Sequence, residues 1–84
     1  MKYELTTNFI KYKGKKLYQI KALKDFSSVK AGDLGGYIEK ESNLSQNGNC
    51  WAFDNAKVYD EAKIYGDAKV CGNAEVWGNA EVYG

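Results

Sequence analysis

The side chains that could carry out chemistry in this chain are carboxylates, lysines, tyrosines and two cysteines, Cys50 and Cys71. The chain contains no His, so no imidazole can activate either thiol, serve as a general base or bind a metal. No pair of carboxylates stands out as an acid and base couple. We therefore expect two inert packing thiols, with Cys50 pointing inward and Cys71 outward, no cofactor, no metal and no enzyme activity.

A second group of candidate residues is aromatic and recurs at six-residue intervals toward the C-terminus. Tyr and Trp are enriched at the energetically dominant positions of protein interfaces, and a row of exposed aromatic side chains is uncommon without a use. The predicted partner-binding residues are these aromatic residues and two neighbouring carboxylates: Tyr59, Tyr65, Trp77, Tyr83, Glu75 and Glu81. The alternative is that the rings only cover the strands and pack against lysine stems or the N-terminal part of the chain.

These aromatic residues belong to a six-residue repeat that occupies residues 55–84. Each line of the repeat has Ala second and Val or Ile fourth, and most lines end in Gly. This periodicity excludes an amphipathic helix. In a meander of two-residue hairpins, each turn would reverse the face that carries Ala and Val, so alternate strands would expose their core residues. A solenoid keeps them all inward, and three lines then close one triangular coil of about 18 residues.

Stacking of such coils predicts a register for the repeat. The expected vertical pairs are Glu39 with Lys57, Lys57 with Glu75, Lys63 with Glu81, Val58 with Val76, Ile64 with Val82, and Ala52 with Val70. Stacking at six or 12 residues would instead bring lysines together, which is unfavourable, whereas charge does not exclude 24. Traced backward, the frame places Ala52 in the Val position, Leu44 in the Ala position and Gly48 in the Gly position, and it begins near residue 38.

The N-terminal part of the chain is basic and has the pattern of strands. Residues 1–30 hold eight Lys and two acidic residues, whereas residues 31–84 hold four Lys and nine acidic residues. Residues 3–23 predict a hairpin that turns at Gly14. Its lysines are expected to form a solvated strand face. Nucleic-acid contact is the alternative, which the absence of Arg weakens, and its candidate residues are Lys11, Lys13, Lys15, Lys16 and Lys21.

The repeat lines, together with Gly32-Asp-Leu-Gly-Gly-Tyr-Ile-Glu39 and Asn43-Leu-Ser45, resemble hexapeptide-repeat proteins of bacteriophages and prophages. The resemblance covers about residues 17–84. It implies an all-β fold, a short left-handed parallel β-helix at residues 37–84 capped by an N-terminal hairpin at residues 1–36. The wider superfamily includes acyltransferases, which typically use a His base that this chain lacks.

From that resemblance we expect a binding protein, a phage accessory factor that inhibits a host protein, such as one of a CRISPR-type defence system. The alternatives are a structural protein that assembles with itself and nucleic-acid binding. No capping segment follows Gly84, so we expect a dimer or trimer that covers the last coil through Ala80, Val82 and Tyr83. No apolar run is long enough to span a membrane and no signal-peptide core is present, so we expect a cytoplasmic protein.

Overall fold

The computed structural model describes residues 1–84, and it is an all-β protein whose sheets are not closed. Its elements are β1 (Tyr3–Tyr12), β2 (Lys15–Ala22), β3 (Leu34–Ile38), η1 (Glu41–Asn43), β4 (Trp51–Ala52), β5 (Lys57–Val58), β6 (Lys63–Ile64), β7 (Lys69–Val70), β8 (Glu75–Val76) and β9 (Glu81–Val82). The single helical element, η1, is a 3₁₀ turn of three residues. No helix is therefore long and apolar enough to cross a bilayer.

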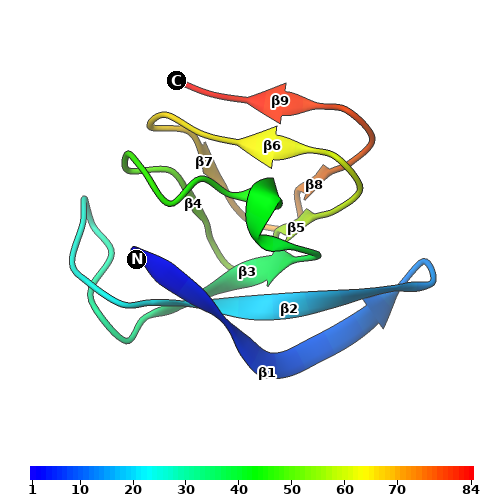
Figure 1. The fold of residues 1–84 in the computed structure, drawn as a ribbon, viewed down its shortest axis with the longest axis horizontal. Coiled ribbons are helices and arrows are strands. Elements are labelled where there is room, and N and C mark those ends of the chain that lie inside the picture. The colour runs from blue at the N-terminus through cyan, green and yellow to red at the C-terminus, as the bar shows by residue number, and fades with distance from the viewer.

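The N-terminal hairpin is continuous with the repeat. β1 and β2 pair antiparallel across a turn at Lys13 and Gly14, both of which have positive φ, 52° and 79°. β2 then pairs with β3, which is followed by the parallel strands β5 and β8, so one five-stranded sheet joins the hairpin to the repeat. Figure 1 shows the hairpin lying across one end of the stacked short strands. The predicted hairpin is confirmed.

The repeat is arranged as three parallel stacks of short strands. One stack holds β3, β5 and β8, a second holds β4 and β7, and a third holds β6 and β9 above a bridge at Leu44. Successive lines contribute to successive stacks, so the chain passes through all three before it returns (Figure 1). We call the segments at residues 37–54, 55–72 and 73–84 the first, second and third layers.

Except at two positions of the first layer, the predicted register is confirmed. Lys57 pairs with Glu75 and Val58 with Val76. The same step of eighteen residues relates the other two stacks, where the pairs are Lys63 with Glu81, Ile64 with Val82, and Ala52 with Val70. The Ala and Val or Ile residues of the lines are buried or half-buried, except for the exposed Ala80, and backbone N–H groups of one layer donate to carbonyls of the next.

In the first layer, two of the predicted positions are wrong. Tyr37, rather than Glu39, pairs with Lys57, and Leu44 lies in the Val position, beneath Ile64. The two residues of each of these pairs are twenty positions apart in the sequence, instead of eighteen. Gly48 nevertheless occupies the Gly position, because a Cβ there would lie 2.5 Å from the carbonyl oxygen of Gly66. Two extra residues therefore sit between Leu44 and Gly48, where the sequence has no Ala or Val to mark the frame.

The first layer and the hairpin share one core. Trp51 is buried and packs edge-on against Tyr3 (ring centroids 6.1 Å apart) and Phe26 (5.3 Å). The Tyr3 hydroxyl donates to the Leu44 carbonyl at 2.5 Å. Lys2 is also buried, and its Nζ donates to the carbonyls of Gly48 (3.2 Å) and Cys50 (2.8 Å). A buried ammonium needs such partners. These hydrogen bonds of Lys2 therefore connect the start of β1 to the end of the segment that contains the two extra residues.

Candidate protein-binding surface

The aromatic position of the repeat faces outward, but the environment of its residues differs from layer to layer. Tyr59, in the second layer, is only 3% exposed, because β1 crosses over it and places the Tyr12 ring 5.8 Å away, edge-on. The expectation that Tyr59 is exposed is therefore wrong. Trp77 and Tyr83 are 58% and 67% exposed, and Tyr65 is 36% exposed. Three of the four predicted aromatic residues are thus open to a partner.

Tyr65 and Tyr83 form an ordered pair on the outer surface of the β6–β9 stack. Their rings are stacked, with centroids 5.1 Å apart and an interplanar angle of 14°. The Tyr65 hydroxyl donates to Oε1 of Glu81 at 2.9 Å, and this hydrogen bond raises the pKa of Tyr65. Two aromatic rings and a carboxylate are therefore held in a defined arrangement at an exposed site. Trp77 follows β8, in a different stack.

Glu75, also predicted to bind a partner, is occupied within the chain. It accepts hydrogen bonds from the hydroxyls of Tyr12 (2.5 Å) and Tyr59 (3.1 Å), and Lys13 Nζ lies 4.0 Å away. The hydrogen bond from Tyr12 is the main cause that lowers the pKa of Glu75, and in return it raises the pKa of Tyr12 to about 12. Glu75 therefore joins the hairpin to the third layer.

The predicted ion pairs of the register do not form, although the backbones of Lys57 and Glu75, and of Lys63 and Glu81, stack as expected. Lys57 Nζ lies 5.2 Å from the centroid of the Tyr12 ring and donates to the Asn55 carbonyl. Glu75 and Glu81 accept hydrogen bonds from tyrosine hydroxyls instead, and Glu39 accepts one from the backbone N–H of Asp60 at 2.8 Å. Exposed ion pairs of this kind contribute little free energy. Hydrogen bonds from the nearby tyrosine hydroxyls to Glu75 and Glu81 therefore form in their place.

The predicted oligomer residues lie at the outer edge of the third layer. Ala80 and Tyr83 are exposed and Val82 is half-buried, although Val82 packs against the main core. Cys50 is buried and Cys71 is exposed, as their expected directions require. The Cys50 thiol lies 3.4 Å from the Nζ atom of Lys2.

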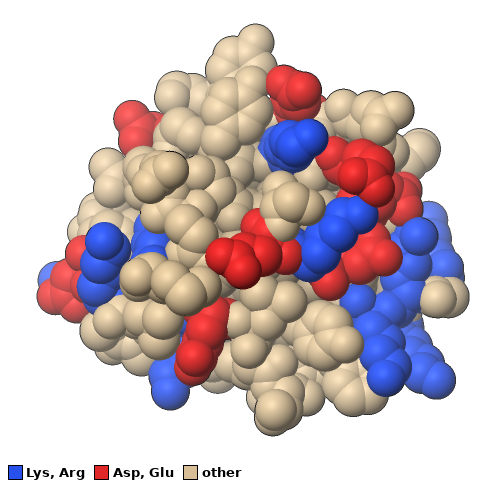
Figure 2. All heavy atoms as spheres, viewed as in Figure 1, with Lys and Arg blue, Asp and Glu red and all other residues tan.

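The lysines proposed for nucleic-acid contact fall into two groups. Lys13 and Lys15 face the acidic layers, where Lys15 Nζ lies 2.9 Å from Oδ1 of Asp60. Lys11, Lys16 and Lys21 are exposed and have no carboxylate within ion-pair distance. Figure 2 shows lysines gathered over the hairpin tip, with a red acidic surface directly beside them. The basic hairpin is therefore partly neutralised by its own chain.

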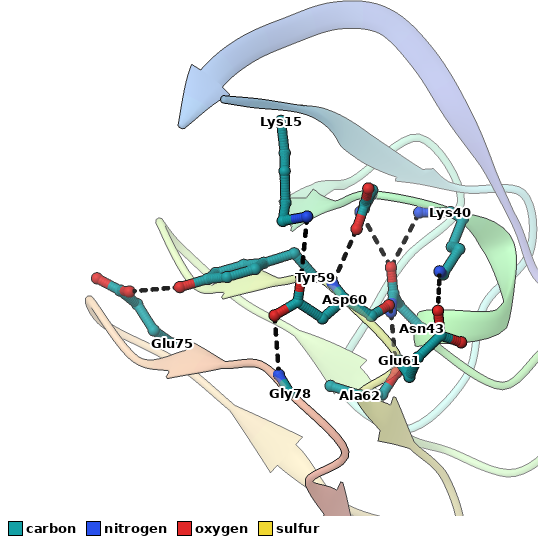
Figure 3. A network of polar contacts seen from close by, with 10 residues as sticks. Lys15, Lys40, Asn43, Tyr59, Asp60, Glu61, Ala62, Glu75 and Gly78 are labelled. Atoms are coloured by element: carbon teal, nitrogen blue, oxygen red, sulfur yellow. Dashed lines mark hydrogen bonds and ion pairs between the residues drawn. The ribbon is translucent and has the colours of Figure 1, made fainter. Parts of the chain in front are cut away.

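Sequence reasoning did not identify the polar network at the corner beside η1 (Figure 3). The fully buried Asn43 side chain donates to the carbonyls of Asp60 (3.2 Å) and Ala62 (2.9 Å) and accepts from the N–H groups of Glu39 and Lys40. One amide thus satisfies four backbone groups. The only sequence signal is the Asn after Glu41-Ser42, which is common in exposed turns as well.

Asp60 connects three parts of the chain at the same corner. Asp60 occupies the Gly position of the repeat, and its backbone has a positive φ of 60°. Its carboxylate accepts from Lys15 of β2 and from the backbone N–H of Gly78 at 3.1 Å in the layer above. The hydrogen bond from Lys15 is the main cause that lowers the pKa of Asp60, followed by the bond from Gly78 (Figure 3). Lys40 lowers the pKa of Glu61 in the same way.

The chain is similar in part to an uncharacterized acetyltransferase, YdcK, of Escherichia coli strain K12. The two are 48% identical over 42 residues, which is 50% of this chain and 13% of the relative. The chain therefore spans about an eighth of the length of the relative that it matches. No protein-family model matches the chain.

This likeness corrects the expectation that the chain is not an enzyme. The name of the relative points to an enzyme family, and that family is of the hexapeptide-repeat type that the repeat lines resemble. The absence of His argued only against catalysis that uses an imidazole. The likeness does not bear on the resemblance to phage proteins.

Proposed function

We propose that residues 37–84 form a short left-handed parallel β-helix that is covered at one end by β1 and β2. The parallel stacks and their eighteen-residue steps support this proposal. Positive φ at the corners, at Asp54, Asp60, Gly66, Gly72 and Gly78, also supports it, because each corner then turns alike. A crystal structure would test the proposal, and a right-handed path or antiparallel third layer would contradict it.

We propose further that this β-helix is a protein-binding module whose contact residues are Tyr65, Trp77 and Tyr83. The observation that carries the proposal is the exposed, stacked pair of Tyr65 and Tyr83 beside Glu81. Rigid aromatic rings supply a large contact area at a low cost in conformational entropy. Tyr65 and Tyr83 already stack on each other in the free chain, so less conformational entropy is lost when these two rings bind a partner.

Site-specific photocrosslinking tests this module while its partner is still unidentified. A photoreactive phenylalanine derivative would replace Trp77 or Tyr83 in cells, and Lys69 as a control, because Lys69 is exposed on the β4–β7 stack. We expect covalent adducts from the two aromatic positions and few from Lys69. Equal adduct yields at all three positions, or none at Trp77 and Tyr83, would contradict the module.

The size of the adduct separates the more specific predictions. An adduct with a different protein agrees with the predicted binding protein, and identification of a host protein would support an inhibitory phage accessory factor. An adduct of twice the chain mass would favour the structural alternative, in which copies of this chain assemble through Ala80, Val82 and Tyr83. In that case, Val82→Asp should also lower the mass measured by light scattering.

Acetyl transfer is a second candidate function, because the relative is named as an acetyltransferase. The likeness covers a small part of that relative, and none of the 84 residues is His. Release of free coenzyme A, with formation of the acetylated acceptor, from acetyl coenzyme A and a primary amine or alcohol tests this candidate on the purified chain when the products are separated by chromatography. Release above a blank that contains heat-unfolded chain would support it, and release equal to that blank would count against acetyl transfer by this chain.

A further inference from the structure

The two faces of the hairpin carry different side chains. Across β1 and β2, Phe9 lies opposite Tyr18 and Lys11 lies opposite Lys16. Side chains alternate between the faces of a strand pair, so these four residues share one face, which we call the outer hairpin face. The pairs Ile10 with Leu17 and Tyr12 with Lys15 belong to the other face. That second face packs on the repeat through Tyr12 and Lys15.

The lysines of the two faces have different electrostatic surroundings. Lys15 meets Asp60 at 2.9 Å, and Lys13, at the turn, lies 4.0 Å from Glu75. On the outer hairpin face, Lys11 and Lys16 lie directly opposite each other, and neither has a carboxylate within ion-pair distance. Like charges placed opposite each other destabilise a strand pair. An anion bound between them would relieve this repulsion.

An exposed aromatic ring lies beside these two lysines. Phe9 is 46% exposed, its ring centroid is 6.0 Å from that of Tyr18, and the Nζ atom of Lys16 lies 4.8 Å from the Phe9 ring centroid. The face therefore combines two cations that have no carboxylate partner with an accessible ring on an antiparallel strand pair. Proteins that bind single strands of nucleic acid use this combination: lysines contact phosphates, and bases stack on aromatic rings.

We propose that the outer hairpin face binds single-stranded nucleic acid, with phosphates at Lys11 and Lys16 and one base stacked on Phe9. A duplex would hide its bases from Phe9, so the single strand is the form that uses all three residues. The chain has no Arg, and Lys acts as a point charge, so binding is independent of base sequence. This surface is separate from Tyr65, Trp77 and Tyr83, so it does not depend on the proposed protein-binding module.

The number of lysines predicts the salt dependence of binding. Two phosphate contacts to a single strand give a slope of about −1.4 in log K against log salt concentration. Binding is therefore weak, and it is best measured at low ionic strength, about 20 mM, where screening is small. The probe is an oligothymidylate labelled at one end and titrated with the full chain while its fluorescence anisotropy is recorded.

A matched pair of double variants tests the assignment. Lys11→Gln with Lys16→Gln removes two charges from the outer hairpin face, and we expect at least about a tenfold loss of affinity. Lys13→Gln with Lys15→Gln removes the same charge from the same hairpin on the other side, and the affinity should change less than about threefold. Phe9→Leu keeps an apolar side chain but removes the ring, so we expect about a fivefold loss or more.

Four outcomes would overturn the proposal: no binding of the oligonucleotide at low salt, an equal loss in both double variants, no effect of Phe9→Leu, or an oligoglutamate that binds as tightly as the oligonucleotide. The last result would assign the face to acidic proteins. All the substituted residues except Lys15 are exposed, and circular dichroism of each variant verifies that a loss of affinity is not a loss of fold.

Discussion

The first layer of the repeat and the two layers above it fill their interiors with different side chains. In the first layer, Leu44 is fully buried in the interior and Asn43 is held among backbone groups. Trp51, at the outward position of its line, is buried against Tyr3 and Phe26. In the upper layers the interior is Ala, Val and Ile64, and Val70 and Val76 retain 9% and 8% exposure. Large side chains that contact the hairpin stabilise the first layer, whereas the upper layers are stabilised by the stacking of equivalent small side chains in register.

This difference indicates where the stability of the chain is concentrated. A buried aromatic side chain contributes several kcal/mol when it is well packed, and an Ala contributes little. The upper layers add backbone hydrogen bonds between layers and small apolar contacts. We therefore expect substitutions in the first layer to unfold the whole chain, and most substitutions in the upper layers to act locally.

The largest effect is expected from the two tryptophans, which differ most between the layers. Trp51→Ala removes a buried side chain that packs on Tyr3 and Phe26, and it should lower the free energy of unfolding by about 3–5 kcal/mol. Trp77→Ala removes an exposed side chain, and it should change that free energy by about 0.5 kcal/mol or less. Urea denaturation followed by circular dichroism measures both. Similar losses in the two variants would show that the layers do not differ.

A smaller effect is expected from two corner glycines. Gly48 and Gly78 have similar positive φ, 73° and 67°. A Cβ at Gly48 would lie 2.5 Å from the Gly66 carbonyl oxygen, whereas one at Gly78 would have no atom within 4 Å. Gly78→Ala should therefore cost about 1–2 kcal/mol, from backbone strain alone. Gly48→Ala should cost more, because the layers must also separate. Equal thermal midpoints in the two variants would remove this distinction.

Alkaline pH tests the contact between the hairpin and the third layer. The hydrogen bond to Glu75 raises the pKa of Tyr12 from 10.0 to about 12, so folding favours the neutral phenol. This contribution is complete below pH 10 and is lost as the pH rises from about 10 to about 12. Tyr12→Phe should be less stable than the wild-type chain at pH 8, and the difference should shrink by pH 11. Urea midpoints that stay equally far apart at both pH values would contradict this contact.

The smallest effect is expected from Asp60 in acid. Lys15 lowers the pKa of this carboxylate below 3.8, so its contribution is present above that value and is lost as the pH falls through the lowered pKa. Lys15→Gln should therefore flatten the decrease in thermal midpoint between pH 5 and pH 2. Lys11→Gln is the control, because Lys11 has no carboxylate partner. A control as flat as Lys15→Gln would show that net charge alone sets the decrease.

The second and third layers could be predicted from the sequence because each line repeats the same two inward positions. Ala and Val at a fixed spacing keep the same positions inward in every line, and the expected step of 18 residues then places Val58 against Val76 and Ile64 against Val82. The first layer could not be predicted in this way. Its inward residues, Ile38, Leu44 and Ala52, have unequal spacing, and nothing in the sequence marks the two extra residues before Gly48.

The sequence predicted the positions of the candidate aromatic residues, but it did not predict which of them are exposed to a partner. Tyr59 and Tyr65 occupy equivalent positions, and only the path of β1 decides that Tyr59 is covered by Tyr12. A repeat pattern describes its own lines and contains no information about a strand that crosses them. The lysines of the hairpin were grouped by sequence, whereas the alternation of the strand pair divides them between two faces with different partners.

The eighteen-residue step between layers has a consequence for how such a chain can change length during evolution. Duplication of three lines adds a whole layer, and every line above it still finds the same stack beneath it. Duplication of a single line shifts each later line to the next stack, so Lys57 would lie where Lys63 lies now, and the corner glycines would change neighbours. Length variants related to this chain should therefore differ by multiples of three lines, and the hairpin need not change with them.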